Sequence, residues 1–134
     1  MMKDMSCLLA VNGTLMRGLA LERNLLDVGA VFCREAQTAA CYRLWSIRDE
    51  YPAMLRVAPG DPAGASIAVE IWSVPAGGLA AILAGEPAGL SVGKVRLLDG
   101  QEVFGVIAEP IAVDQMREIT CYGGWRAYLA ATKN

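Results

Sequence analysis

The sequence predicts a small α+β domain in which a mostly antiparallel sheet curls into a barrel and carries about three helices. Three patterns support this fold class. Large aliphatic residues stand at every second position of residues 66–72, namely Ile67, Val69 and Ile71, and this period of two is typical of a half-buried strand. Asp99-Gly100 separates two further apolar segments and is a strong signal for an antiparallel hairpin. Residues 15–28 carry an apolar face at helical spacing.

The length suits one domain with one core, which we place at residues 1–134. Of these residues 54% are hydrophobic and 19% are charged, so a folded chain is expected. No uninterrupted apolar segment approaches the roughly 20 residues that span a bilayer, and residues 1–10 lack a signal-peptide core. A net charge of −2 gives no electrostatic basis for nucleic-acid binding. We expect a cytoplasmic protein that binds neither membrane nor nucleic acid.

The first half of the chain predicts one helix among several strands. Residues 6–11 are apolar and predict a buried strand. The helix at residues 15–28 ends at Gly29, a residue type favoured just after a helix. Three short strands are then expected around a polar turn and after a Tyr-Pro pair, at residues 30–32, 41–46 and 51–57.

A loop rich in proline and glycine, residues 59–64, leads to the alternating strand at 66–72. Glu70 and Trp72 share one face of that strand. A short helix follows at residues 75–84 and ends in a segment with two glycines and a proline. The remaining expected elements are hairpin strands at 93–98 and 102–108, a brief helix or turn at 114–119, and a terminal helix behind Gly123-Gly124.

The junction between the first strand and the first helix is the best place to look for a binding site. An apolar run ends there in Asn12-Gly13-Thr14-Leu15. At a helix start, the N–H groups of Gly13, Thr14 and Leu15 lack intrahelical partners and form a cradle for a carboxylate or an oxyanion. Gly13 has no Cβ, so the backbone can approach a ligand closely. The side chains of Asn12 and Thr14 could add donors, or Thr14 could cap the helix.

The cysteines and the absence of histidine limit the chemistry. The four cysteines, at positions 7, 33, 41 and 121, form no CxxC pair, so we expect free thiols and no metal site. Without histidine, the usual Ser–His and Cys–His nucleophile pairs are absent. Acid–base work would fall to Glu, Asp, Lys, Tyr or Cys, and we expect no cofactor.

Residues 12–18 (Asn-Gly-Thr-Leu-Met-Arg-Gly) resemble the Tyr-Gly-Ser-Leu-type turn of the gamma-glutamylcyclotransferase-like superfamily. The order of elements is also similar, with Tyr-Pro-Ala-Met at 51–54, a strand carrying Glu70, and a helix leading to Glu86. Within that superfamily, the likeness is closest to the C-terminal domain of allophanate hydrolase. The likeness covers nearly the whole chain, and three segments carry it, at residues 11–26, 68–75 and 123–128.

The resemblance implies a small barrel with a cavity beside the turn at residues 12–15. In cyclotransferases of this superfamily the backbone of that turn binds the substrate, and a glutamate after the second helix is the general acid and base; Glu86 is the matching residue. In allophanate hydrolase the corresponding domain is thought to decarboxylate N-carboxycarbamate released by the amidase domain. This chain departs from the pattern because Val11 and Asn12 replace the usual aromatic and no histidine can assist the reaction.

Four side chains have both a functional and a structural interpretation. Apolar neighbours of Glu86 would raise its pKa toward the range of a general acid–base, whereas a solvated loop carboxylate would have no such role. If Glu70 is buried, it needs a positive partner, and the choice lies between an ion pair with Arg17, Arg43 or Arg56 and contact with substrate. Arg17 could also reach a bound carboxylate or face solvent, and Tyr51 could line the cavity rim or only pack its turn.

Two classes of function remain open from the sequence. The first is an enzyme-like domain that acts on a small carboxylated amide or urea-derived compound by decarboxylation or amide cleavage, with gamma-glutamyl-amine cyclotransfer as a related alternative. The second is a non-catalytic module for small-molecule binding or assembly, either as a homodimer or beside a partner amidase.

Overall fold

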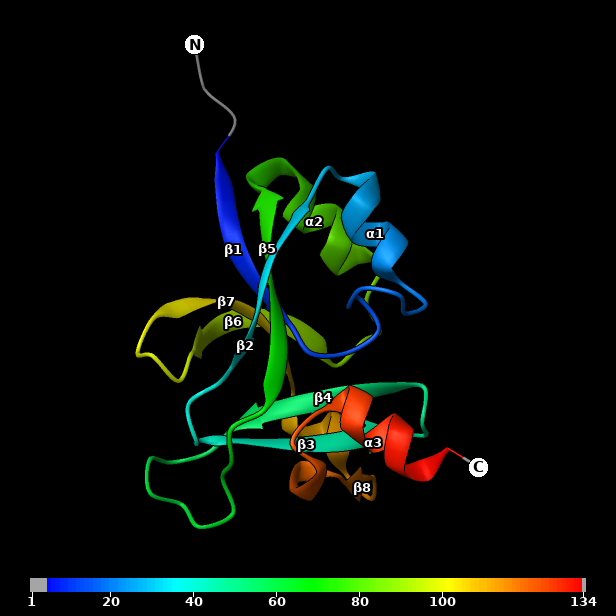
Figure 1. Ribbon diagram of the computed structural model, residues 1–134. Coiled ribbons are helices and arrows are strands. Elements are labelled where there is room, and N and C mark those ends of the chain that lie inside the picture. The colour runs from blue at the N-terminus through cyan, green and yellow to red at the C-terminus, as the bar shows by residue number, and fades with distance from the viewer. Residues whose placement is uncertain (1–4, 134) are drawn as a thin grey trace.

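The computed structural model describes residues 5–133 and shows two sheets with helices at their ends (Figure 1). The strands are β1 (Ser6–Val11), β2 (Val31–Gln37), β3 (Tyr42–Ile47), β4 (Tyr51–Arg56), β5 (Ala68–Pro75), β6 (Leu90–Arg96), β7 (Glu102–Ala108) and β8 (Arg117–Glu118). The helices are α1 (Glu22–Asp27), α2 (Ala76–Ala84) and α3 (Trp125–Thr132), with 3-10 turns η1 (Pro110–Val113) and η2 (Thr120–Tyr122).

The larger sheet has the strand order β2-β5-β1-β7-β6, and the smaller has the order β4-β3-β8. Among the strands described, only β1 and β7 pair in parallel. The larger sheet curls until its two edges meet at one end, where the Ala39 N–H donates to the Arg96 carbonyl and the Leu98 N–H to the Gln37 carbonyl, both at 2.9 Å. The α+β class, the antiparallel bias and the three helices are confirmed, but the curled sheet does not close along its length.

The hydrophobic core lies where the two sheets meet, and it fixes the central strand β1. Leu9 and Val11 are fully buried in β1, and they share one core cluster with the buried Leu44 and Met54 of the smaller sheet. Burial of each such side chain contributes about 1.5–3 kcal/mol. Val11 is opposite Glu70 in the β1–β5 register. The end of β1 therefore brings the following turn and Glu70 together in the middle of the molecule.

The first helix is shorter than the sequence predicts, and its start is in a different place. The apolar spacing predicts residues 15–28, but α1 spans only Glu22–Asp27. Gly18 has a left-handed φ of 77°, and the Arg17 N–H donates to Glu70 Oε1 instead of to a helical carbonyl. Tertiary contacts thus replace the first two turns of the expected helix. Thr14 is not the N-cap, because Leu21 occupies that position without a side-chain cap.

Three smaller predictions also need correction. The strand expected at 30–32 continues to Gln37 as an edge strand. The connection between β6 and β7 is longer than a two-residue hairpin, because the Leu97 N–H donates to the Gln101 carbonyl at 2.8 Å outside the Asp99-Gly100 pair. The segment expected as a brief helix or turn at 114–119 contains β8, which pairs with β3. Within residues 5–133, no helix has the length and hydrophobicity needed to cross a membrane.

Candidate functional site

The turn after β1 lies at the junction of the two sheets and contacts β4. A Cβ on Gly13 would lie 2.5 Å from Cδ of Pro52, so this close approach requires glycine. Within the described part of the chain, the N–H groups of Gly13, Thr14 and Leu15 have no protein acceptor, whereas the Met16 N–H bonds back to the Gly13 carbonyl at 2.9 Å. The turn therefore offers free amides, although Pro52 occupies the space that the missing Cβ of Gly13 leaves.

Six of the predicted site residues line one small cavity, namely Asn12, Gly13, Thr14, Leu15, Tyr51 and Glu86. The rest of its wall is apolar and comes from Val11, Pro52, Leu90 and Val106. The free volume is about 10 Å³, which is room for one water molecule. The structure thus brings the turn and Glu86 together, but a larger ligand requires one wall to move.

Glu86 follows the C-cap of α2, Gly85, and is half-buried in the lining of this cavity. Its main-chain N–H bonds to the Leu83 carbonyl at 3.1 Å, which continues the last turn of the helix. Burial raises the pKa of the Glu86 carboxyl above its ordinary value of 4.5, and no cation among residues 5–133 opposes the shift. A carboxylic acid in this state can keep its proton closer to neutral pH than a solvated glutamate can.

Asn12 is buried in the lining of the cavity, and its side chain has an acceptor left for a ligand, not the expected donor. Its Nδ2 donates to the Val106 carbonyl at 3.1 Å and to Sδ of Met54 at 3.8 Å, so both amide hydrogens are used inside the protein. The carbonyl partner also fixes which side-chain atom is nitrogen, because two carbonyl oxygens would repel each other. Only Oδ1 remains to contact a ligand, and it can accept an N–H but cannot donate to a carboxylate.

Glu70 and Arg17 lie outside this small cavity, in an ion cluster around the buried Glu70. Glu70 is 2% exposed and accepts the Arg17 N–H at 2.9 Å, Arg17 Nε at 3.2 Å, Arg126 Nη2 at 3.0 Å and Trp72 Nε1 at 3.2 Å. Arg17 also pairs with Glu35 at 3.0 Å and lies 3.6 Å above the ring of Phe32. Of the three partners that the sequence offers for Glu70, Arg17 is one, while Arg43 pairs with Glu118 and Arg56 binds Tyr42.

The cluster keeps Glu70 ionised despite its burial. Desolvation alone would raise the pKa of Glu70, but the hydrogen bonds from the Arg17 backbone, Arg126, Trp72 and the Arg17 side chain outweigh it and lower the pKa. Its four donors are supplied by the protein itself. The structural interpretation of Glu70 therefore fits this geometry better than direct contact with substrate.

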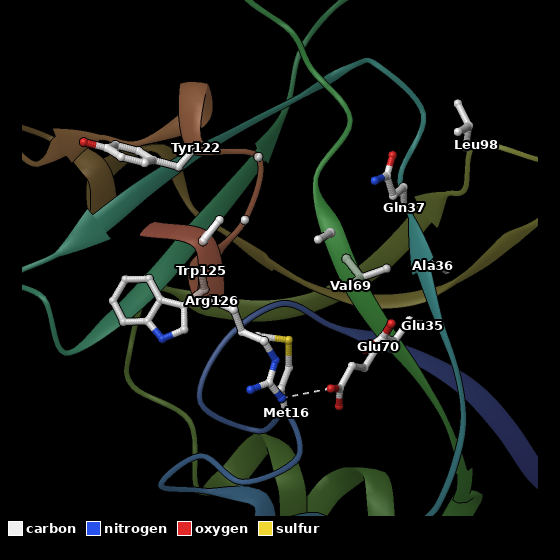
Figure 2. Close-up of a pocket in the computed structure, with 14 residues that line it drawn as sticks. Met16, Glu35, Ala36, Gln37, Val69, Glu70, Leu98, Tyr122, Trp125 and Arg126 are labelled. Atoms are coloured by element: carbon white, nitrogen blue, oxygen red, sulfur yellow. Dashed lines mark hydrogen bonds and ion pairs between the residues drawn. The ribbon is translucent and has the colours of Figure 1, made fainter. Parts of the chain in front are cut away.

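A larger groove lies on the other side of the turn (Figure 2). Its volume is about 630 Å³, within the range of ligand pockets, and its walls come from β2, β5, the segment before α3 and the start of α3. Figure 2 shows Arg126 beside Met16 and directed at Glu70 across this groove. Sequence reasoning missed Arg126, since 56 residues separate it from Glu70. The signal that could have found it is its place in the segment 123–128, which carries the family resemblance.

Comparison with known proteins identifies relatives of the whole fold. The model of the allophanate hydrolase C-terminal domain family matches residues 7–130. A crystal structure of a protein specific to uropathogenic E. coli is 51% identical, with a TM-score of 0.90, covering 94% of this chain and 97% of that one. Kluyveromyces lactis allophanate hydrolase is 28% identical with a TM-score of 0.90, over 96% of this chain and 22% of that one.

The curated relatives are much longer than this chain. Urea amidolyase of Saccharomyces cerevisiae is 31% identical over 132 residues, which is 93% of this chain and 7% of that protein. A gamma-glutamyl cyclotransferase structure shares the fold alone, with 18% identity and a TM-score of 0.50 over 78% of this chain and 68% of that one. The resemblance to the allophanate hydrolase C-terminal domain is thereby confirmed, and the chain belongs to that family.

Proposed function

We propose that this domain decarboxylates a small N-carboxylated amide, with the turn at residues 12–15 as the carboxylate site and Glu86 as the general acid. One observation carries the proposal: Gly13, Thr14 and Leu15, whose N–H groups have no acceptor in the described part of the chain, line the same cavity as a glutamate whose pKa is raised by burial. The names of the relatives, allophanate hydrolase and urea amidolyase, favour a urea-derived compound. N-carboxycarbamate is the substrate that we expect.

The proposed step needs one proton and one acid. The C–N bond to one carboxylate breaks, its electron pair stays on nitrogen, and carbon dioxide leaves. Protonated Glu86 supplies the proton to that nitrogen, so N-carboxycarbamate and the acid become carbamate, carbon dioxide and ionised Glu86. Glu86 then recovers its proton from water. A protonated Glu86 also avoids repulsion between its own charge and the dianionic substrate.

The two ends of the cavity suit the two carboxylates differently. The main-chain amides of the turn would hold the carboxylate that remains, and Oδ1 of Asn12 would accept the substrate N–H. The apolar wall of Pro52, Leu90 and Val106 would face the carboxylate that leaves, whose charge disappears as carbon dioxide forms. Because the free volume is about 10 Å³, binding must widen the cavity. We expect the segment between α2 and β6 to move, because Gly85 and Gly89 flank Glu86 there while the turn is anchored to Glu70.

The test follows carbon dioxide and ammonia release when an amidase domain generates N-carboxycarbamate from allophanate in situ. Wild-type protein should accelerate the reaction above the rate without it, and Glu86→Gln should remove about 10²-fold or more of that acceleration. Glu109→Gln changes an exposed glutamate outside the cavity and should leave the rate unchanged. An equal rate for wild type and Glu86→Gln would exclude Glu86 as the acid. Turnover of gamma-glutamyl amines instead would support cyclotransfer.

A second candidate function is favoured by the groove beside Arg126. Its volume of about 630 Å³ suits a small molecule far better than the cavity at Glu86 does. In that case the domain is a binding module without its own reaction. Calorimetry with allophanate, malonate and gamma-glutamyl amines separates the two candidates. Binding that Glu86→Gln leaves unchanged, without turnover by wild-type protein, would support the binding module.

A further inference from the structure

The loop that connects β1 to α1 separates the small cavity from the large groove. Thr14 and Leu15 line the cavity with Glu86, whereas Met16 lines the groove with Arg126. Only a few residues thus divide two spaces of very different size. The position of this loop decides where the free amides of the turn lie relative to Glu86.

Within the loop itself, the main-chain hydrogen bonds are local. The Met16 N–H donates to the Gly13 carbonyl, the Leu19 N–H to the Met16 carbonyl and the Leu21 N–H to the Thr14 carbonyl, at 2.8–3.1 Å. These bonds shape the loop, but they do not attach it to the sheets. Its start is attached through the Asn12 side chain and the buried Leu15 and Met16, so the segment after Met16 depends on contacts with side chains that other elements supply.

Side chains of two distant elements hold the main chain of Arg17 on both sides. Glu70 of β5 accepts the Arg17 N–H at 2.9 Å, and Arg126 of α3 donates through Nη2 to the Arg17 carbonyl. The same Nη2 also pairs with Glu70 Oε2 at 3.0 Å, so the two clamping side chains hold each other. Charge-assisted bonds of this kind are stronger than neutral ones and have a fixed geometry. One peptide segment is therefore fixed to β5 and to α3 together.

We propose that Glu70 and Arg126 are positioning residues that hold the amides of the 13–15 turn opposite Glu86. The proposal rests on the proposed function, because the position of the turn matters only if its amides bind the substrate carboxylate. It also explains why a buried carboxylate is placed at this point of β5. An apolar residue at position 70 could pack against Trp72, but it could not accept the Arg17 N–H.

The test compares Glu70→Gln with Glu118→Gln. Glu118 of β8 pairs with Arg43 at 2.6 Å, and that pair has no hydrogen bond to the β1–α1 loop. Each substitution thus removes one carboxylate charge from an ion pair. We expect Glu70→Gln to weaken the affinity for malonate, a stable analogue of N-carboxycarbamate, by about 10-fold to 100-fold. Glu118→Gln should leave that affinity unchanged.

Hydrogen exchange of the Met16 and Leu21 amides measures loop order without any ligand. In Glu70→Gln these amides should exchange faster by a larger factor than the Val57 amide, which reports on the second sheet. If Glu70→Gln fails to fold, Arg126→Met provides the test instead. It removes the more exposed partner of the Glu70–Arg126 pair and should give the same exchange pattern.

If the exchange rate rises by the same factor at all amides and the malonate affinity is unchanged, the cluster is only structural and the proposal is overturned. If wild-type protein binds no malonate, the proposed function fails instead. The exchange pattern then still decides whether Glu70 and Arg126 hold the loop.

Discussion

Replacing Gly13 with alanine should destabilise the domain and displace the turn. The new Cβ would lie 2.5 Å from Cδ and 2.6 Å from Cγ of Pro52, about 1 Å closer than an ordinary carbon–carbon contact. Overpacking of this kind costs about 1–3 kcal/mol. For 134 residues, 2 kcal/mol corresponds to a fall in Tm of roughly 6–10 °C. A shift of the amides by about 1 Å should also weaken malonate binding by up to about 10²-fold.

Gly77→Ala is the matched control, because the same substitution should have the opposite sign there. Gly77 lies exposed in α2, and a Cβ at that position meets no atom within 4 Å. The better helix propensity of alanine should stabilise the protein by about 0.5–1 kcal/mol. Thermal denaturation of both variants, followed by circular dichroism, measures the difference. A Gly13→Ala variant as stable as wild type would refute the packing of the turn against Pro52.

Three further predictions concern single side chains. Glu86→Gln should stabilise the protein at pH 7, because a carboxyl whose pKa is raised by burial opposes folding once it ionises; the gain in Tm should vanish as the pH falls below 4.5, where both states are protonated. Asn12→Asp should lower the free energy of unfolding, measured by urea denaturation, by roughly 3–5 kcal/mol, because a buried charge would face the Val106 carbonyl. If the variant is as stable as wild type at pH 7, Asn12 does not make that contact. Tyr42→Phe should lower the free energy of unfolding by about 1.5–3 kcal/mol, because the buried hydroxyl accepts hydrogen bonds from Arg56 and from the Arg96 N–H. It should leave the malonate affinity unchanged.

The spacing of apolar residues along the chain predicted individual strands and helices whose bounds depend on neighbouring residues. The strand at residues 6–11 matches β1, and the helix expected at 75–84 matches α2 within one residue. Alternation along 66–72 correctly placed Glu70 and Trp72 on one face, where Trp72 Nε1 donates to Glu70. The helix expected at 15–28 was wrong in its first part, because the apolar spacing contains no information about a carboxylate on β5 that takes the Arg17 N–H.

The candidate site divides in the same way. The turn and Glu86 were expected to share a cavity through the resemblance to a known family, and in the structure both line one small cavity. Its size of about 10 Å³ and the donor bonds of Asn12 to Val106 depend on packing between β1, β4 and β7, which the sequence pattern does not contain. The groove and Arg126 were missed for the same reason, since their parts come from β2, β5 and α3.

The most direct test is a crystal structure of the protein in complex with malonate, from crystals grown with malonate or soaked in it. The account predicts one carboxylate within hydrogen-bond distance of the N–H groups of Gly13, Thr14 and Leu15, the other close to Glu86, and a cavity wider than the present 10 Å³. Malonate bound in the groove beside Arg126, with the turn still closed over Glu86, would contradict it.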